Sequence, residues 1–538
     1  MIMDNTRVYL KQNALAEPLF NQWYAWPYLI PPHTAAMYIA NWHLTIMKSF
    51  VKSPQIHVAA VKDPAMIGGP FMNCDPGRTD SVNALMEKTL KGQGDLLRLA
   101  TAIKDLDEML LKSADGYSME SLYQEVPDML KGYVELTYDL NNQPSLRFIE
   151  GLLYRSPYYD PSLQSIELSL INYDERPFVF STPRLEEEGH LRVNLPFNSG
   201  AIDELFKMRF EPGTLGHIRE ALGIKDEDLN LFASFFTEEE PRPYQKYEGE
   251  GVRVRYFGHA CILIESKHTT IMCDPLISYN YPAQFERYTY ADLPPSIDYA
   301  LITHNHQDHC LFEHLLQMRH KIKTLVIPKT AGGGLADPSL KLILQNIGFN
   351  NVREIDEMES IPVDGGSITG LPFLGEHADL GIRAKTAYLI NLNNQTMLCA
   401  ADSNNLEPKL YEHIHDCFAD LDVLFIGMEC VGAPLTWLYG PLLTRPLARK
   451  MDQSRRFSGS NCQKGADIVD RFKPQQVYVY AMGHEPWLTF LSSIEYTAAS
   501  PQIIESNKLV QACRERGIVS ERLLYQKELF LGESVNRT

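Results

Sequence analysis

A short histidine-rich stretch, His-Asn-His-Gln-Asp-His, constrains this chain more than any other feature of its sequence. It follows an apolar run, Tyr299 to Ile302, that is typical of a buried strand. His304 and His306, two residues apart, can project to the same side, and Asp308 and His309 follow about one turn later. Imidazole and carboxylate groups together favour a first-row divalent metal ion. These four candidate ligands exceed what one catalytic ion with an open position needs, so the stretch indicates two ions.

Length and composition limit the kind of protein to which such a site belongs. A chain of 538 residues exceeds one ordinary core and predicts two domains. Its net charge of −18 argues against a nucleic-acid partner. The nine cysteines include no C-x-x-C pair, and the N-terminus lacks the layout of a signal peptide. No apolar run is long enough to cross a membrane. We therefore expect a soluble cytoplasmic protein that binds no membrane.

The boundary between the two predicted domains falls in a charged, proline-punctuated segment, Glu238 to Lys246. Residues 1–245 predict an α+β domain with an antiparallel sheet, with strand-like runs at 165–171, 178–181 and 191–195. This part carries no chemical motif. Residues 246–538 hold the histidine-rich stretch, so we expect them to form the catalytic domain.

The second domain resembles the metallo-β-lactamase fold superfamily. The resemblance rests on H-x-H-x-D-H after a strand, on a later isolated Asp402 and His484, and on the alternating entry strand Val252 to His259. It implies an αββα sandwich with a dinuclear metal site at one edge of its sheets. His259 and Asp274 occupy typical positions of the superfamily, and we expect them to support the ligands without binding metal.

Three further ligands follow the first motif in that superfamily, each just beyond a strand: a His, a bridging Asp and a His. Asp402 fits the bridging position and His484 fits the last. The middle position holds Glu376 and His377, and either neighbour could bind. A glutamate ligand would add a third carboxylate and shift the preference from zinc toward iron or manganese.

The chain resembles the diiron β-hydroxylases of antibiotic biosynthesis, such as that of chloramphenicol. The resemblance rests on its length, its N-terminal α+β domain and the Gly-Glu-His sequence in the middle position. The resemblance implies one iron on His304, His306 and Glu376, a second on Asp308, His309 and His484, and Asp402 between them. It also implies O2 as co-substrate and an external electron donor. The substrate would be an amino acid held as a thioester on a nonribosomal peptide synthetase carrier domain, and hydroxylation would occur at its β-carbon. The N-terminal domain would serve dimerisation and access, so we expect a homodimer.

Other interpretations remain open. A dinuclear zinc or manganese hydrolase would use a metal-bound hydroxide, with His377 in place of Glu376 as ligand. A third interpretation is a non-catalytic binding protein that retains a metal-binding fold. The loop 429–439 either lines a substrate channel or simply packs. The basic residues between 445 and 464 either contact the phosphate of the carrier's phosphopantetheine arm or an acidic carrier domain, or they form ordinary solvated surface. They are Arg445, Arg449, Arg455, Arg456 and Lys464.

Overall fold

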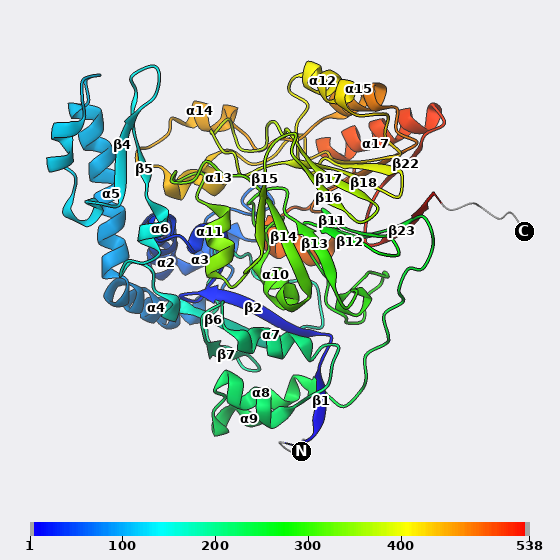
Figure 1. Cartoon of the computed structure of the whole chain (residues 1–538). Helices are drawn as coiled ribbons and strands as arrows, with labels where there is room; N and C mark the ends of the chain where they lie inside the picture. Colours follow the sequence, from blue (N-terminus) through cyan, green and yellow to red (C-terminus); the bar gives the residue numbers. More distant parts are fainter. Residues whose placement is uncertain (1–4, 533–538) are drawn as a thin grey trace, which may run out of the picture.

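The C-terminal half of the protein is an αββα sandwich, seen at the right of Figure 1. This computed structural model describes residues 5–532. Residues 1–4, which belong to the N-terminal segment considered above for a signal peptide, lie outside the described residues. Two seven-stranded sheets pack face to face, and helices cover both outer faces. The predicted fold class is thereby confirmed.

The first sheet has the strand order β15-β14-β13-β12-β11-β10-β23, and the second the order β16-β17-β18-β19-β20-β21-β22. The first sheet contains β10 (Val252–Gly258), β11 (Cys261–Glu265), β12 (Thr270–Cys273), β13 (Ile297–Leu301), β14 (Ile322–Pro328), β15 (Val352–Ile355) and β23 (Lys527–Leu531). The second contains β16 (Ser360–Val363), β17 (Gly366–Leu371), β18 (Ala387–Leu392), β19 (Gln395–Cys399), β20 (Val423–Gly427), β21 (Gln476–Tyr480) and β22 (Val519–Arg522).

Alternation along the strands divides their side chains between two layers. In β10, Val252, Val254 and Tyr256 enter the core between the sheets, whereas Arg253 and Arg255 point outward to the carboxylate of Glu265. The helices of this half are α10 (Phe312–Met318), α11 (Leu340–Asn346), α12 (Pro408–Cys417), α13 (Thr436–Tyr439), α14 (Arg449–Ser454), α15 (Cys462–Phe472), α16 (Thr489–Ser492) and α17 (Pro501–Glu515). Helices α10 and α11 cover the first sheet, and α12, α15 and α17 cover the second.

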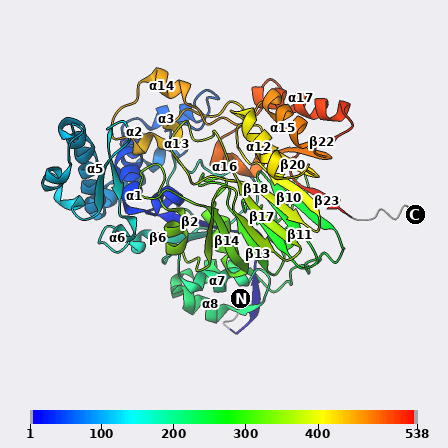
Figure 2. The same ribbon diagram turned by 45° about the horizontal axis from the view of Figure 1, so that its top comes forward.

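The N-terminal part contains a four-stranded antiparallel sheet, β3-β2-β6-β7, and a group of helices. Its strands are β1 (Arg7–Leu10), β2 (Ala14–Phe20), β3 (Trp23–Tyr24), β4 (Val134–Tyr138), β5 (Pro144–Phe148), β6 (Gln164–Leu170), β7 (Leu191–Asn194), β8 (Gly213–Thr214) and β9 (Phe236–Thr237). Its helices are α1 (Pro32–Tyr38), α2 (Leu44–Lys52), α3 (Pro54–Ala60), α4 (Thr79–Gly92), α5 (Gly94–Ser113), α6 (Glu150–Leu153), α7 (Gly200–Lys207), α8 (Leu215–Leu222) and α9 (Leu229–Ser234). Figures 1 and 2 place α5 and α12 at opposite sides of the molecule.

One strand predicted in this part is wrong. Residues 178–181 are irregular, although they are buried and apolar as a strand would be. Val179 donates its N–H to the Phe490 carbonyl, and the ring of Phe180 packs edge-on to Trp437. The segment therefore packs against the C-terminal half instead of pairing in a sheet. Within residues 5–532, no helix has the length and apolar character needed to cross a membrane.

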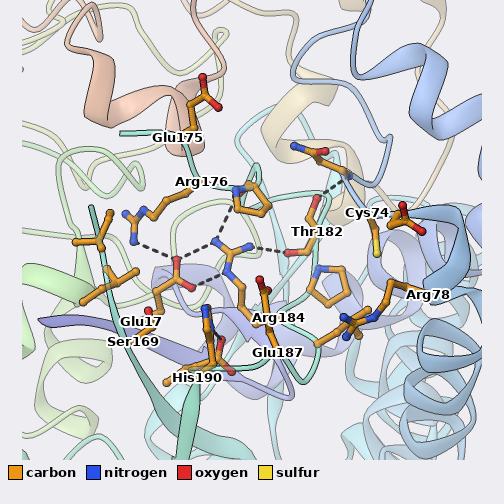
Figure 3. Close-up of a pocket in the computed structure, with 18 of the residues that line it drawn as sticks. Glu17, Cys74, Arg78, Ser169, Glu175, Arg176, Thr182, Arg184, Glu187 and His190 are labelled. Atoms are coloured by element: carbon orange, nitrogen blue, oxygen red, sulfur yellow. Dashed lines mark hydrogen bonds and ion pairs between the residues drawn. The ribbon is translucent and has the colours of Figure 1, made fainter. Parts of the chain in front are cut away.

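A buried ion-pair network joins the two halves, and Figure 3 shows its N-terminal members Glu17, Arg176 and Arg184. Glu17 of β2 accepts two hydrogen bonds from the Arg184 guanidinium, at 2.6 and 2.9 Å. Arg176 bridges Glu17 at 3.1 Å to Glu313 of α10 at 3.0 Å. Glu17, Arg176 and Arg184 line a cavity of about 380 Å³, in which their charges are paired with one another. The network fixes the N-terminal sheet against the helix that follows the histidine-rich stretch.

Candidate metal centre

The candidate ligands gather where strands of both sheets end. The strand β13 leads into His304, β17 leads into Glu376, and β19 leads into Asp402. Strand ends are rigid positions, because each strand is held by hydrogen bonds on both sides. The sandwich thus brings together residues that are almost a hundred positions apart in the sequence.

The first group of ligand atoms comes from His304, His306 and Glu376, all buried and all within 4.8 Å of one another. His306 Nδ1 lies 3.1 Å from His304 Nε2 and 3.1 Å from Glu376 Oε1. Burial first, and then neighbouring His309 and His306, hold the pKa of His304 well below its usual value. A neutral imidazole is the form that binds a metal ion.

Asp402 lies between this group and His309. Its Oδ2 is 2.9 Å from His309 Nε2 and 3.9 Å from His304 Nε2. Its Oδ1 is buried and has no hydrogen-bond partner among the described residues. Burial, together with Asp402 and other acids, raises the pKa of Glu376 well above its usual value. Carboxylates this close and this buried call for cations to compensate them.

The second group consists of His259, Asp308 and His309. The backbone N–H of Gly483 donates to His259 Nδ1 at 3.1 Å, so a neutral His259 carries its proton on Nε2. That Nε2–H faces Asp308 Oδ2 at 3.2 Å. A protonated nitrogen cannot bind a metal ion. The geometry therefore makes His259 a hydrogen-bond donor to Asp308, and Asp308 and His309 remain the candidate ligands of this group.

Asp274 and Thr303 orient the two central imidazoles. Asp274 accepts from His309 Nδ1 at 2.8 Å and from the Thr303 hydroxyl at 2.6 Å. Thr303 Oγ1 in turn accepts from His304 Nδ1 at 3.0 Å. Both histidines therefore direct an unprotonated Nε2 toward the centre. The supporting position that the sequence suggested for Asp274 agrees with these contacts.

His306 is oriented from the other half of the protein. Its Nε2 lies 3.1 Å from the Tyr439 hydroxyl, which is hydrogen-bonded to Tyr28. Tyr28 donates to the Ala336 carbonyl at 2.6 Å and accepts from Asn305 at 3.1 Å. This relay requires a proton on His306 Nε2 and so leaves Nδ1 free to bind metal. Tyr28, which lies between β3 and α1, thus supports the site from the N-terminal part.

Replacing Tyr439 with Phe tests this relay. Without the hydroxyl, the proton of His306 is no longer fixed on Nε2. We expect the affinity for the ion of the first group to fall roughly tenfold. Competition with a chelator, using Zn²⁺ or Co²⁺ as the probe, measures it. Tyr478→Phe is the matched control, since the Tyr478 hydroxyl contacts only Gln476. Equal loss in both variants would mean that Tyr439 matters only for folding.

Comparison with known proteins identifies the family. Residues 9–241 match the model of the diiron non-heme beta-hydroxylase N-terminal domain, and residues 253–434 match a beta-lactamase superfamily domain. The chain is 39% identical over 534 residues to the 4-amino-L-phenylalanyl-CmlP-peptidyl-carrier-protein 3-hydroxylase of Streptomyces venezuelae, covering 98% of this chain and 100% of that protein. The chain belongs to the diiron non-heme β-hydroxylase family. The crystal structure of CmlA, a diiron β-hydroxylase from Streptomyces venezuelae, matches this hydroxylase with a TM-score of 0.92, at 39% identity over 98% of this chain and 100% of the other. A variant of CmlA matches it with a TM-score of 0.90, at the same identity and coverage.

The donor set of this hydroxylase fits two iron ions. It combines neutral imidazoles with several carboxylates, which suits iron better than the imidazole-rich sets typical of zinc. The Oδ1 of Asp402, buried and without a hydrogen-bond partner among the described residues, would be available to a metal ion in addition to Oδ2.

Two histidines that the sequence suggested as possible ligands, His377 and His484, lie outside the three groups of potential ligands in the described part of the chain. His377 is buried, stacks on His306 at 4.4 Å between ring centroids, and has no hydrogen bond on either ring nitrogen. Of these two neighbours, Glu376 and not His377 belongs to the group formed with His304 and His306. His484 contacts the Tyr496 ring edge-on at 5.5 Å. The structure does not bring it together with Asp308 and His309.

Sequence reasoning missed Glu429 as a residue of the centre. This half-buried carboxylate follows β20 and has a pKa well above its usual value, because of burial first and then Asp402 and Asp308. Its carboxyl group is thus close enough to Asp402 and Asp308 for their charges to act on it. Its place just beyond a strand, like that of Asp402, was the available signal, but the sequence interpretation of the loop 429–439 was limited to a channel wall or a packed loop.

Backbone strain marks the same loops. Several non-glycine residues beside the ligands adopt left-handed conformations, with φ of 64° at Glu376, 50° at Ala378, 45° at Ala401, 50° at His259 and 39° at Asp274. Such conformations cost about 1–3 kcal/mol each and persist only where the surroundings enforce them. Gly375, with φ of 76°, could not carry a side chain, because its Cβ would lie 2.6 Å from that of Asn404.

Proposed function

We propose that this protein is an O2-dependent diiron monooxygenase that hydroxylates the β-carbon of an amino acid held as a thioester on a nonribosomal peptide synthetase carrier domain. The observation that carries the proposal is the match along nearly the whole chain to a hydroxylase named for a carrier-protein substrate. The buried set of imidazoles and carboxylates supports it. An antibiotic-forming pathway is the corresponding setting. A zinc or manganese hydrolase is not favoured, because the relative that matches nearly the whole chain is a hydroxylase.

We propose His304, His306 and Glu376 as ligands of one iron and Asp308 and His309 as ligands of the other. Asp402 is proposed as the bridge, which makes Glu376 and Asp402 the catalytic carboxylates. Glu429 is a better candidate than His484 for the remaining position, because the charges of Asp402 and Asp308 help to raise its pKa, whereas His484 belongs to none of the groups of potential ligands among the described residues. When bound, the two irons supply the reduction of O2 and the oxidising power for C–H hydroxylation, which side chains cannot provide.

The protein's own residues prepare this chemistry. Asp274, Thr303 and Tyr439 fix the tautomers of the binding histidines, so that the ligand set is preorganised. The rings of Tyr439 and Phe457, both buried, lie 6.2 and 5.5 Å from His306 and keep water from this side of the site. Asp308, at 21% exposure of its side chain, is more open than Asp402 or Glu376. Access of O2 is therefore expected near Asp308.

Several broader features remain proposals. We place the domain boundary at 245/246, between β9 and β10. A cytoplasmic location is supported by nine cysteines without a disulfide. A homodimer is supported by exposed apolar side chains around the β4–β5 hairpin, namely Leu111, Tyr117, Tyr123 and Leu140. An external electron donor is required, because hydroxylation by O2 consumes two electrons that the substrate does not supply.

The function is tested with iron-loaded, chemically reduced protein, O2 and aminoacyl carrier domains. We expect about two irons per chain, visible absorption in the oxidised form, and a product that gains one oxygen atom at the β-carbon by mass spectrometry. Zinc-loaded protein should be inactive. If instead the zinc form released free amino acid from the carrier and the iron form did not hydroxylate it, the hydrolase would be the correct function.

A further inference from the structure

The segment 444–456, here called the basic strap, is an unusually positive part of an acidic protein. It contains five cations and one acid, whereas the whole chain has a net charge of −18. The acid, Asp452, points inward and accepts from the backbone N–H and the hydroxyl of Thr436, each at 2.9 Å. The outward face of the strap is therefore positive, with no carboxylate of its own to balance it. Figures 1 and 2 both show α14, the helix of the strap, at the outer edge of the molecule.

Two of its cations are free to meet a partner. Arg449 and Lys450 are exposed and have no hydrogen bond or ion pair with any residue in the range 5–532. Arg445 reaches Asp107 of α5 at 3.3 Å but keeps 63% of its side chain exposed. Met451 beside them is 53% exposed and adds an apolar contact. Free cations around an exposed methionine are suited to an anionic protein surface.

The inner side of the same strap contacts the metal centre. Arg455 donates from Nε to the Ala378 carbonyl at 2.9 Å, two residues from Glu376. Phe457, the residue directly after the strap, places its ring 5.5 Å from that of His306. Six residues separate Arg449 from Arg455, which even a fully extended chain would span in about 20 Å. An anion held on α14 therefore lies within about 20 Å of Arg455, which contacts the loop of Glu376, and a long flexible arm can cover such a span.

We propose that the basic strap is the docking surface for the carrier domain, with Arg449 and Lys450 facing the phosphodiester of its phosphopantetheine arm and the acidic residues around it. This inference rests on the proposed function, since it assumes a carrier-bound substrate. The chemistry matches: a phosphodiester is a permanent anion at the base of the arm, and cations are its natural partners. Electrostatic attraction at the rim of such an interface raises the association rate and makes binding sensitive to salt.

The test is the double variant Arg449→Glu/Lys450→Glu. Both positions lie in the first turn of α14, where a glutamate is compatible with the helix dipole, so folding should be preserved. We expect the Kd for an aminoacyl carrier domain, measured by calorimetry at low salt, to rise at least tenfold. Its dependence on salt should become weaker. The control variant, Lys88→Glu/Lys91→Glu, reverses two exposed cations of α4 and should bind as the wild type does.

A second measurement separates docking from the chemistry. Turnover of the same amino acid as a thioester of free pantetheine, which lacks both phosphate and carrier, should be equal in wild type and variant. Unchanged carrier affinity in the α14 variant would overturn the docking surface while leaving the proposed function intact. An equal loss in the α4 variant would overturn it as well, since net charge alone would then explain the effect. Absence of carrier binding by the wild type would refute both proposals.

Discussion

Replacing Asp402 with Asn should remove at least one iron per chain and lower the hydroxylation rate by at least about 100-fold. Asn has nearly the same shape, but its amide has one neutral oxygen and no charge. It cannot bridge two cations, nor can it balance them beside His309, which lies 2.9 Å from the Asp402 carboxylate. Elemental analysis and the visible spectrum of the oxidised protein report the metal loss independently of activity. The rate follows from single-turnover experiments with carrier-bound substrate.

The matched control for this variant is Asp379→Asn. Asp379 lies three residues after Glu376 but is exposed, and its φ of 59° is one that Asn tolerates well. The same chemical change there should leave iron content and rate unaltered. Two irons and normal turnover in Asp402→Asn would show that Asp402 is not the bridge. Loss of iron in both variants would point instead to a general sensitivity of these loops.

The local part of the centre could be predicted from the sequence, because its signal is local. His304, His306, Asp308 and His309 lie within six residues after one strand, so their proximity does not depend on the rest of the fold. Asp402 could be placed because a clear hairpin precedes it. The αββα architecture followed from the resemblance together with the alternating strands.

The remaining residues depend on how distant loops turn, which spacing does not encode. His484 follows β21 as Asp402 follows β19, yet left-handed conformations at Ala481 and Gly483 turn the chain. The Gly483 N–H then meets His259, and the His484 ring goes to Tyr496. Tyr28 lies 277 residues before Asn305, its partner, in a part without any chemical motif. Only the packed structure shows that it supports His306.

The N-terminal half is therefore part of the site's framework as well as a neighbour of it. Its core is continuous with the helices that cover the first sheet, and Tyr24 donates to Glu313 at 2.8 Å. Glu313 lies on α10, which begins three residues after His309. Loosening the junction between the halves should thus affect the metal centre as well as overall stability.

The strongest test of that junction is Arg184→Met, which we expect to lower the free energy of unfolding by about 3 kcal/mol. The substitution keeps much of the apolar stem but leaves Glu17 buried with only Arg176, at 3.1 Å, as its ionic partner. Burial alone would raise the pKa of Glu17, but Arg184 and then Arg176 lower it to about 2. Removing the larger of these two stabilising partners leaves a carboxylate whose desolvation is poorly compensated.

The pair also predicts a pH dependence with a definite sign. The pKa of Glu17 falls from about 4.5 in the unfolded chain to about 2 in the folded protein. Its stabilisation is therefore complete above pH 4.5 and is lost as the pH falls from 4.5 toward 2. Urea unfolding of the wild type between about pH 3 and pH 7 covers the upper part of this transition and the plateau above it, and it should show this loss of stability. In Arg184→Met the loss should be smaller, because less stabilisation of the charged form remains.

Arg516→Met provides the control, since Arg516 and Asp470 form an exposed pair at 2.6 Å that should contribute less than about 1 kcal/mol. The double variant Glu17→Leu/Arg184→Met should be more stable than Arg184→Met alone, because it removes the buried charge together with its partner. A double variant less stable than the single one would show that Glu17 stabilises the fold by packing and not through its ion pair. Metal affinity measured on the same proteins then tells whether the junction between the halves supports the binding of iron.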